Sequence, residues 1–282
     1  MAIRTVGVVG SGQMGNGIAQ VAACCGMEVT MVDIKQEYLD RGVSAISNSL
    51  EKLVSKDRMS REEADSAFSR IDSSVELESL SNCDLVVEAI PEVPELKFST
   101  FSKLDSICKP QAILASNTSS ISINEIARHT NRADRVIGMH FMNPVPIMKL
   151  VEIINGSETS EEVTSQVISA SEEMGKTPLS CRDSPGFVSN RILMPMINEA
   201  ILTLQEGVAE PEAIDGIMKL GMNHPIGPLA LADLIGLDTV LHIMHVLEGG
   251  IGSDKYAPAN LLVEMVERGQ LGRKSGSGFY QY

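Results

Sequence analysis

The sequence predicts an α/β protein in which a mostly parallel sheet domain, residues 1–185, is followed by an all-helical C-terminal domain, residues 186–282. Two observations predict this order. Short apolar runs typical of buried strands alternate with helical patterns as far as Cys181, as in parallel sheets that are covered by helices on both faces. After the segment Asp183-Ser-Pro-Gly186 the patterns are helical, separated by glycine and proline.

The first elements form a strand–helix–strand unit. An apolar strand leads into the loop Gly10-Ser-Gly-Gln-Met-Gly15, an alanine-rich helix follows, and a second strand ends in Asp33. This order is the dinucleotide-binding fingerprint of Rossmann-type domains, whereas the glycines alone would fit an ordinary strand–turn–helix. We expect Gly10 to allow the tight turn, Gly12 to let the backbone approach a pyrophosphate, and Gly15 to let helix and strand pack closely.

The loop and the acidic strand end together predict the cofactor. Backbone N–H groups and the dipole at the helix start favour an anionic diphosphate. Asp33 is placed to accept hydrogen bonds from both hydroxyls of a ribose, and its charge would repel a 2′-phosphate, so NAD is expected rather than NADP. The loop residues expected at the cofactor are Gly10, Ser11, Gly12, Gln13, Met14 and Gly15.

The composition limits the class of protein. A chain of 282 residues with 43% hydrophobic and 21% charged residues is long enough for two globular domains. Its net charge of −14 argues against a nucleic acid or an anionic membrane as partner. No apolar run reaches membrane-spanning length, and the fingerprint begins so near Met1 that no signal or transit peptide is expected. A cytoplasmic protein is the simplest expectation.

The five cysteines form no C-x-x-C pair, and their number is odd. This pattern favours small buried side chains in a reducing compartment over a disulfide framework or a metal site. The cysteines are Cys24, Cys25, Cys83, Cys108 and Cys181.

A long helix is expected after the second strand, because apolar residues recur at steps of three and four between Leu39 and Leu53. Ser49, Lys52 and Lys56 would lie together on a different face of this helix. In an acidic protein, these residues are either the basic patch that a phosphate-bearing substrate needs or an ordinary solvated surface.

The remaining elements follow from the same kinds of pattern. In the first domain, strands are expected at 84–90, 112–115, 135–140, 149–154 and 177–181, and helices at 61–69, 95–107 and 161–175. On the inner side of the helix at 95–107 we expect Leu96, Phe101, Leu104 and Ile107. In the second domain, helices are expected at 187–206, with a kink at Pro195, and at 210–220, 229–234, 237–247 and 259–268. Their apolar faces fit either a dimer interface or ordinary core packing.

Four side chains fall at or just past the carboxyl ends of expected strands, where such sheets bind ligands: Asp33, Glu92, Ser119 and His140. A nicotinamide enzyme that oxidises an alcohol needs a base, and His140 suits this role because histidine changes charge near neutral pH. Glu152 on the next strand is placed to hydrogen-bond the other ring nitrogen and to stabilise the imidazolium, while Ser119 offers a hydroxyl donor. By residue type a histidine beside a glutamate is more often structural, but its position at the strand ends favours catalysis.

Several motifs stand in one order over essentially the whole chain: Gly10–Gly15, Asp33, Ser116-Asn-Thr-Ser-Ser120, His140-Phe-Met-Asn-Pro-Val-Pro146, Lys149-Leu-Val-Glu152, Asp183-Ser-Pro-Gly-Phe187 and Leu271-Gly-Arg-Lys-Ser-Gly-Ser-Gly-Phe-Tyr280. In this order the chain resembles the L-3-hydroxyacyl-CoA dehydrogenase family, and in length its short bacterial 3-hydroxybutyryl-CoA dehydrogenases. The glycine usual at the second loop position is Ser11 here, which we expect to be harmless because the spacing is intact.

The resemblance implies reversible NAD-dependent oxidation of an (S)-3-hydroxyacyl-CoA. His140 would be the catalytic acid/base, Glu152 its partner, and Ser119 the donor to the substrate's 3-oxygen. Asn190, which without the resemblance reads as a helix-surface residue, would reach toward the thioester. The NAD contacts implied by the family are Asp33, Glu92, Lys97, Ser119, Asn143 and Lys274, and the CoA contacts are Ser49 and Lys56.

The CoA contacts favour the basic-patch interpretation of Ser49, Lys52 and Lys56. An acyl-CoA substrate and a homodimer through the helical domain are therefore expected. Two alternatives stay open: a related dehydrogenase of a free hydroxy or sugar acid, and a non-catalytic NAD-binding protein on the same fold.

Overall fold

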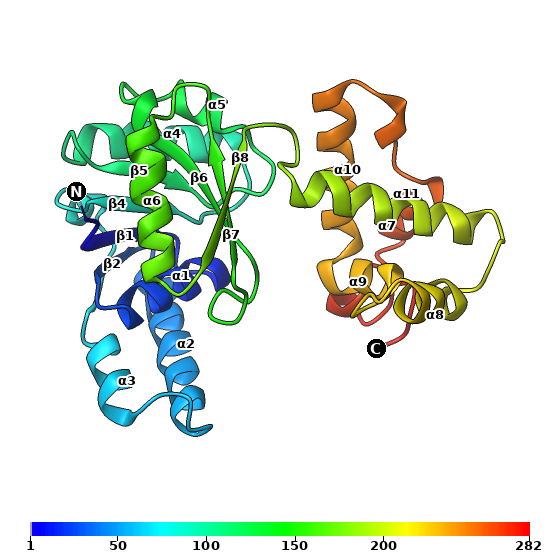
Figure 1. The fold of residues 1–282 in the computed structure, drawn as a ribbon, viewed down its shortest axis with the longest axis horizontal. Coiled ribbons are helices and arrows are strands. Elements are labelled where there is room, and N and C mark those ends of the chain that lie inside the picture. The colour runs from blue at the N-terminus through cyan, green and yellow to red at the C-terminus, as the bar shows by residue number, and fades with distance from the viewer. Residues whose placement is uncertain (1) are drawn as a thin grey trace. The chain divides into compact units, whose positions relative to one another are not determined.

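The computed structural model describes residues 2–282, which form two compact units (Figure 1). The first unit ends at Asp183 and is built around a sheet, whereas the second, Ser184–Tyr282, is helical. The predicted fold class is confirmed.

The sheet of the first unit has eight strands in the order β3-β2-β1-β4-β5-β6-β7-β8. Neighbouring strands are parallel except for β6 and β7, which run antiparallel. The carboxyl ends of β1, β2, β4, β5 and β6 therefore meet at one edge of the sheet, beside the start of β7. The strands are β1 Thr5–Val9, β2 Glu28–Val32, β3 Ile71–Ser74, β4 Leu85–Glu88, β5 Ile113–Ser116, β6 Val136–Phe141, β7 Leu150–Asn155 and β8 Thr177–Arg182.

Helices cover both faces of the sheet, as a mostly parallel sheet requires (Figure 1). One face is covered by α1 Gln13–Cys24, α2 Gln36–Val54 and α6 Glu161–Glu173. The other carries α4 Pro94–Ile107 and α5 Ile123–Ala127, and the short helix α3 Arg61–Phe68 follows α2. The sequence patterns missed β3, whose residues are mostly polar and partly exposed, and α5, which is too short to show a helical period.

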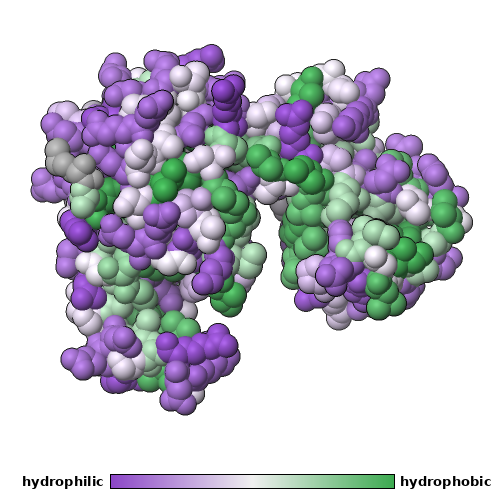
Figure 2. All heavy atoms as spheres, viewed as in Figure 1, coloured by the Kyte–Doolittle hydropathy of each residue, from purple (hydrophilic) through white to green (hydrophobic). Residues whose placement is uncertain are grey.

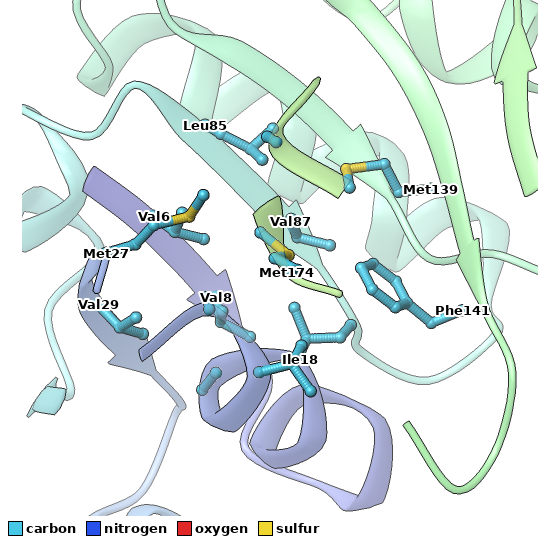
Figure 3. Packing of buried hydrophobic residues seen from close by; sticks show 14 of the residues in the cluster. Val6, Val8, Ile18, Met27, Val29, Leu85, Val87, Met139, Phe141 and Met174 are labelled. Atoms are coloured by element: carbon cyan, nitrogen blue, oxygen red, sulfur yellow. The ribbon is translucent and has the colours of Figure 1, made fainter. Parts of the chain in front are cut away.

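The core of the first unit lies between the sheet and the first of these helix layers (Figure 3). Ile18 of α1 points toward Val8 of β1 and Phe141 of β6, and all three are buried. On α4, Phe101 and Leu104 are buried as predicted. Leu96 is 43% exposed, so its predicted inward orientation is wrong; the buried face of α4 instead begins with the next residue, Lys97, and continues through Phe101.

The cysteines divide by position in the fold. Cys83 and Cys108 are buried, and burial raises the pKa of the Cys83 thiol to about 12. Cys24, in contrast, is exposed at the last position of α1, so its predicted burial is wrong. Among residues 2–282, no group of three or more His, Cys, Asp or Glu side chains is placed to hold a metal ion.

The second unit packs five α-helices around an aliphatic core that includes Ile197, Leu229, Val240 and Met244. The five predicted helices are confirmed, and Pro195 lies inside the first of them. They are α7 Ser189–Gln205, α8 Pro211–Gly221, α9 Pro228–Ile235, α10 Leu237–Ile251 and α11 Asn260–Glu267.

Apolar side chains are also exposed on the second unit, where they gather over α8 (Figure 2). Ile217, Leu220 and Met222 are each at least 60% exposed. In the described part of the chain no single helix is long and apolar enough to cross a membrane; α9 and α10 pass that test only together, and they meet at 98°.

Candidate active site

The glycine loop joins β1 to α1, and its conformation shows why two of its glycines are needed. Gly10 has a φ of +98°, and a Cβ there would lie 2.7 Å from the carbonyl oxygen of Ala89. A Cβ at Gly15 would lie 1.7 Å from the carbonyl oxygen of Gly10. The tight turn and the close packing of helix on strand are therefore as predicted.

Gly12 differs from both, because no contact within residues 2–282 requires a glycine at this position. Its φ of −63° suits any residue, and a Cβ there would have no protein atom within 4 Å. The space lies at the N-terminus of α1, where backbone N–H groups favour a diphosphate. The loop therefore fits a dinucleotide: a side chain at this position would fill the space that the pyrophosphate needs.

Asp33, just past β2, is held against this loop. Its Oδ2 accepts hydrogen bonds from both the backbone N–H and the hydroxyl of Ser11, each at 2.8 Å, and its Oδ1 accepts one from the N–H of Ile34 at 2.7 Å. Ser11 is buried. The hydroxyl of Ser11 is thus bonded to the acid that the fingerprint assigns to the ribose, a contact that a glycine at this position would lack. That the variation is harmless stays a prediction.

His140 and Glu152 face one another across the antiparallel pair β6–β7, where they are direct register partners. Nδ1 of His140 lies 2.8 Å from Oε2 of Glu152. The two residues are 9% and 4% exposed, so their interaction is little screened by water. A buried imidazole is thus oriented by a buried carboxylate at the edge of the sheet where the parallel strands end.

The loop after β5 carries Ser119, and Glu92 organises this loop. One oxygen of Glu92 accepts hydrogen bonds from the backbone N–H groups of Ser119 and Ser120, at 2.9 and 3.0 Å, and from the Thr118 hydroxyl. Burial alone would raise the pKa of Glu92, but the nearby charge of Lys97 and these hydrogen bonds outweigh it and hold that pKa below its usual value.

The same loop is tied to the strand that bears the histidine. The side-chain oxygen of Asn117 accepts a hydrogen bond at 2.9 Å from the backbone N–H of Phe141, which follows His140. Ser119 and His140 are therefore set on segments that are bonded to each other.

Beneath this loop lies a buried ion network that the sequence interpretation missed. Glu88, at the end of β4, is fully buried. Lys97 of α4 is only 1% exposed. Nζ of Lys97 lies 2.6 Å from Glu88, 3.2 Å from Glu92 and 3.1 Å from the carbonyl oxygen of Ile90. The other oxygen of Glu88 accepts from the Ser116 hydroxyl at 2.6 Å.

These contacts occupy the three donors of the Lys97 ammonium group. The NAD contact implied for Lys97 stays a prediction, since the structure engages this side chain in holding Glu88 and Glu92. The available sequence signal was the glutamate itself, an acid inside the apolar run 85–90.

Two family models together match nearly the whole chain. Residues 5–184 match the NAD binding domain of 3-hydroxyacyl-CoA dehydrogenase, and residues 186–282 match its C-terminal domain. The chain belongs to the 3-hydroxyacyl-CoA dehydrogenase family. It is therefore an NAD-dependent oxidoreductase by family, as the resemblance implied.

Individual relatives of this dehydrogenase are similar to it over nearly their full length. A probable 3-hydroxybutyryl-CoA dehydrogenase of Deinococcus radiodurans is 59% identical, over 98% of this chain and 99% of the relative. A 3-hydroxybutyryl-CoA dehydrogenase of Bradyrhizobium diazoefficiens is 50% identical, over 99% and 96%. The crystal structure of an (S)-3-hydroxybutyryl-CoA dehydrogenase from Ralstonia eutropha superposes with a TM-score of 0.98 at 52% identity, covering 100% of this chain and 99% of that one.

The two lysines of the predicted CoA patch, Lys52 and Lys56, lie around the end of α2. This helix ends at Val54, and Lys56 lies in the turn that follows, before Asp57 with its φ of +53°. The prediction that Lys56 continues one helix face is therefore wrong, because the chain turns before that position. Lys52 and Lys56 are exposed and Ser49 is half-buried.

An open groove of about 430 Å³ adjoins this end of α2. Leu53 and Met59 line it from one side, and Met148 lines it from the loop that follows β6. Asn143 is exposed in the same loop, which the buried Lys176 holds by donating to the carbonyl oxygens of Val145 and Met148. Burial lowers the pKa of Lys176, and the charge of Lys149 lowers it further.

Two of the predicted site residues lie in the second unit of the dehydrogenase. Asn190, in the first turn of α7, is 7% exposed, so the interpretation as a surface residue is wrong. Lys274 lies near the C-terminus and forms an ion pair with Asp238. Its segment is anchored by the buried Asp233, which accepts hydrogen bonds from the backbone N–H groups of Phe279 and Tyr280 at 3.0 and 2.9 Å.

Proposed function

We propose that this dehydrogenase interconverts (S)-3-hydroxybutyryl-CoA and acetoacetyl-CoA, with His140 as the catalytic acid/base. The names of the relatives described above support the substrate. The observation that carries the mechanism is the buried pair of His140 and Glu152, 2.8 Å apart, at the sheet edge that also holds the glycine loop.

The pair suits proton transfer in both directions. A carboxylate is an acceptor only, so in the neutral imidazole Nδ1 carries the proton and Nε2 offers its lone pair. In the oxidation, Nε2 of His140 takes the proton of the C3 hydroxyl, and Glu152 stabilises the imidazolium that forms. In the reduction, the same nitrogen returns the proton to the 3-oxygen. NAD supplies the hydride chemistry when it is bound at the glycine loop.

Other residues position the substrate in this proposal. The hydroxyl of Ser119, on the loop held by Glu92, donates to the 3-oxygen, and Asn190 binds near the thioester. Lys52 and Lys56 bind the phosphates of CoA, with Ser49 beside them. These roles follow the family resemblance. The exposure of Lys52 and Lys56 supports their proposed role in binding the phosphates of CoA.

The helical unit is proposed to close over the acyl group and to form a homodimer. The exposed apolar side chains at α8 support the dimer, because an exposed apolar patch is typical of an interaction surface.

Oxidation of NADH with acetoacetyl-CoA, compared with free acetoacetate, tests the substrate class. We expect turnover with the thioester and at most a trace with the free acid, because the free acid lacks the CoA contacts. Equal activity with both would favour the free hydroxy-acid alternative, and activity with neither would favour a non-catalytic protein.

Lys56→Ala tests the proposed CoA contact in the same assay. Remote contacts act mainly in binding, so the KM for acetoacetyl-CoA should rise roughly tenfold while kcat changes little. Lys103→Ala, which removes an exposed lysine on α4, is the matched control and should leave both constants unchanged. A fall in kcat with an unchanged KM would place Lys56 outside the CoA site.

A further inference from the structure

We propose that Ser11 is a positioning residue that orients the Asp33 carboxylate for the ribose of the cofactor and strengthens the preference for NAD over NADP. The proposal rests on NAD binding at the glycine loop and does not depend on which acyl-CoA is reduced. It concerns a position that the fingerprint leaves open to any residue type.

The hydrogen bonds that Asp33 already accepts indicate which of its two oxygens faces the cofactor. A carboxylate offers about four lone-pair sites. Three are occupied here: two on Oδ2, by the N–H and the hydroxyl of Ser11, and one on Oδ1, by the N–H of Ile34. Oδ1 carries fewer of these bonds than Oδ2, so it is the oxygen with more room for the ribose; the two ribose bonds expected for Asp33 stay a prediction.

The packing around Ser11 carries the second step. The side chain is 3% exposed, and α2 crosses it at Gly42. A Cβ at Gly42 would lie 2.7 Å from the carbonyl oxygen of Ser11 and 2.9 Å from its Cβ. Ser11 is therefore confined between α2 and Asp33, and its hydroxyl is held on the carboxylate without needing a bound ligand.

The consequence is a fixed carboxylate plane. Because Ser11 donates both bonds to Oδ2, the less occupied Oδ1 is the oxygen presented to the ribose, at a position set before binding. Preorganisation of this kind improves affinity because less ordering remains to be done on binding. It also prevents the carboxylate from turning away from a 2′-phosphate, so the repulsion that disfavours NADP is retained.

Ser11→Ala tests this directly, because it removes the hydroxyl and keeps the backbone N–H bond. We expect the Kd for NADH, measured by titration of NADH fluorescence, and the KM for NADH to rise about tenfold, as the loss of a hydrogen bond to a charged group predicts. The kcat should stay within about twofold, and the ratio of kcat/KM for NADH to that for NADPH should fall. Ser11→Gly should reproduce all three changes.

Ser171→Ala is the matched control, because it removes a buried hydroxyl that donates to the carbonyl oxygen of Val167 at 2.8 Å within α6. It should leave the Kd and the cofactor ratio unchanged. Unchanged NADH affinity and cofactor ratio in both Ser11 variants would overturn the proposal. So would equal losses in the Ser11 and Ser171 variants, since these would show a general loss of stability. The binding titration needs no turnover, so it separates this proposal from the choice of acyl substrate.

Discussion

Lys97, Glu88 and Glu92 form a network in which one ammonium group contacts two carboxylates, one of them fully buried. Removing charges from water is costly, and a buried ion that loses its partner keeps that cost. Lys97 contacts both glutamates, so its removal would leave the buried carboxylate of Glu88 without its cation. The network also holds Ser116 and the loop that carries Ser119, so one buried side chain links stability to the site.

Lys97→Met should therefore be strongly destabilising. The expected loss in the free energy of unfolding is about 3–5 kcal/mol, measured by urea unfolding at pH 7. Lys109→Met removes a lysine whose ion pair with Asp84 is partly exposed, and its loss should be about 1 kcal/mol or less. Similar losses in the two variants would contradict the compensating role of Lys97.

At the scale of elements, Asp84 joins the start of β4 to β1 and to the end of α4. It accepts hydrogen bonds from the backbone N–H groups of Arg4 and Thr5, at 2.9 and 3.0 Å, and from Nζ of Lys109 at 2.6 Å. Burial alone would raise the pKa of Asp84, but these bonds outweigh it and lower that pKa from 3.8 to about 2.

A lowered carboxyl pKa stabilises the fold above the unfolded-state value, and this stabilisation is lost as pH falls through the folded-state value. The contribution of Asp84 should thus be complete above about pH 4 and disappear between pH 4 and pH 2. In Asp84→Asn the midpoint of urea unfolding should be lower at pH 5, and its fall between pH 4 and pH 2 should be shallower than in the wild type. An equally steep fall would show that other carboxyls govern this range.

Elements with a strong periodic pattern were predictable, and elements without one were not. Seven strands and the α-helices of both units other than α5 were predicted from the sequence patterns. The polar edge strand β3 and the five-residue α5 carry neither signal. The position of Lys56 was missed because the helix period gives no sign of where the chain turns after Val54.

The site was predictable where a residue type suits one chemical role. The fingerprint glycines, Asp33 and His140 fall into this class. The hydroxyl of Ser11 on Asp33 and the contacts of Lys97 depend on which segments lie together, and local pattern does not contain that information. Glu88 was visible as an acid in an apolar run, but its partners were not.

On the scale of the whole molecule, the sheet unit gathers the glycine loop, the Ser119 loop and the pair of His140 and Glu152 at one edge of the sheet. Asn190 and Lys274, for which the family resemblance implies contacts with substrate and NAD, lie in the helical unit. The family match spans both units, with one model over residues 5–184 and the other over residues 186–282.

The central claim is that His140 transfers the proton at the 3-oxygen, and its most direct test is the turnover of His140→Ala with NADH and acetoacetyl-CoA. General acid–base catalysis contributes about 10²–10⁴-fold, so kcat should fall by that factor while the directly titrated affinity for NADH stays at its wild-type value. Near-normal turnover in this variant would contradict the account.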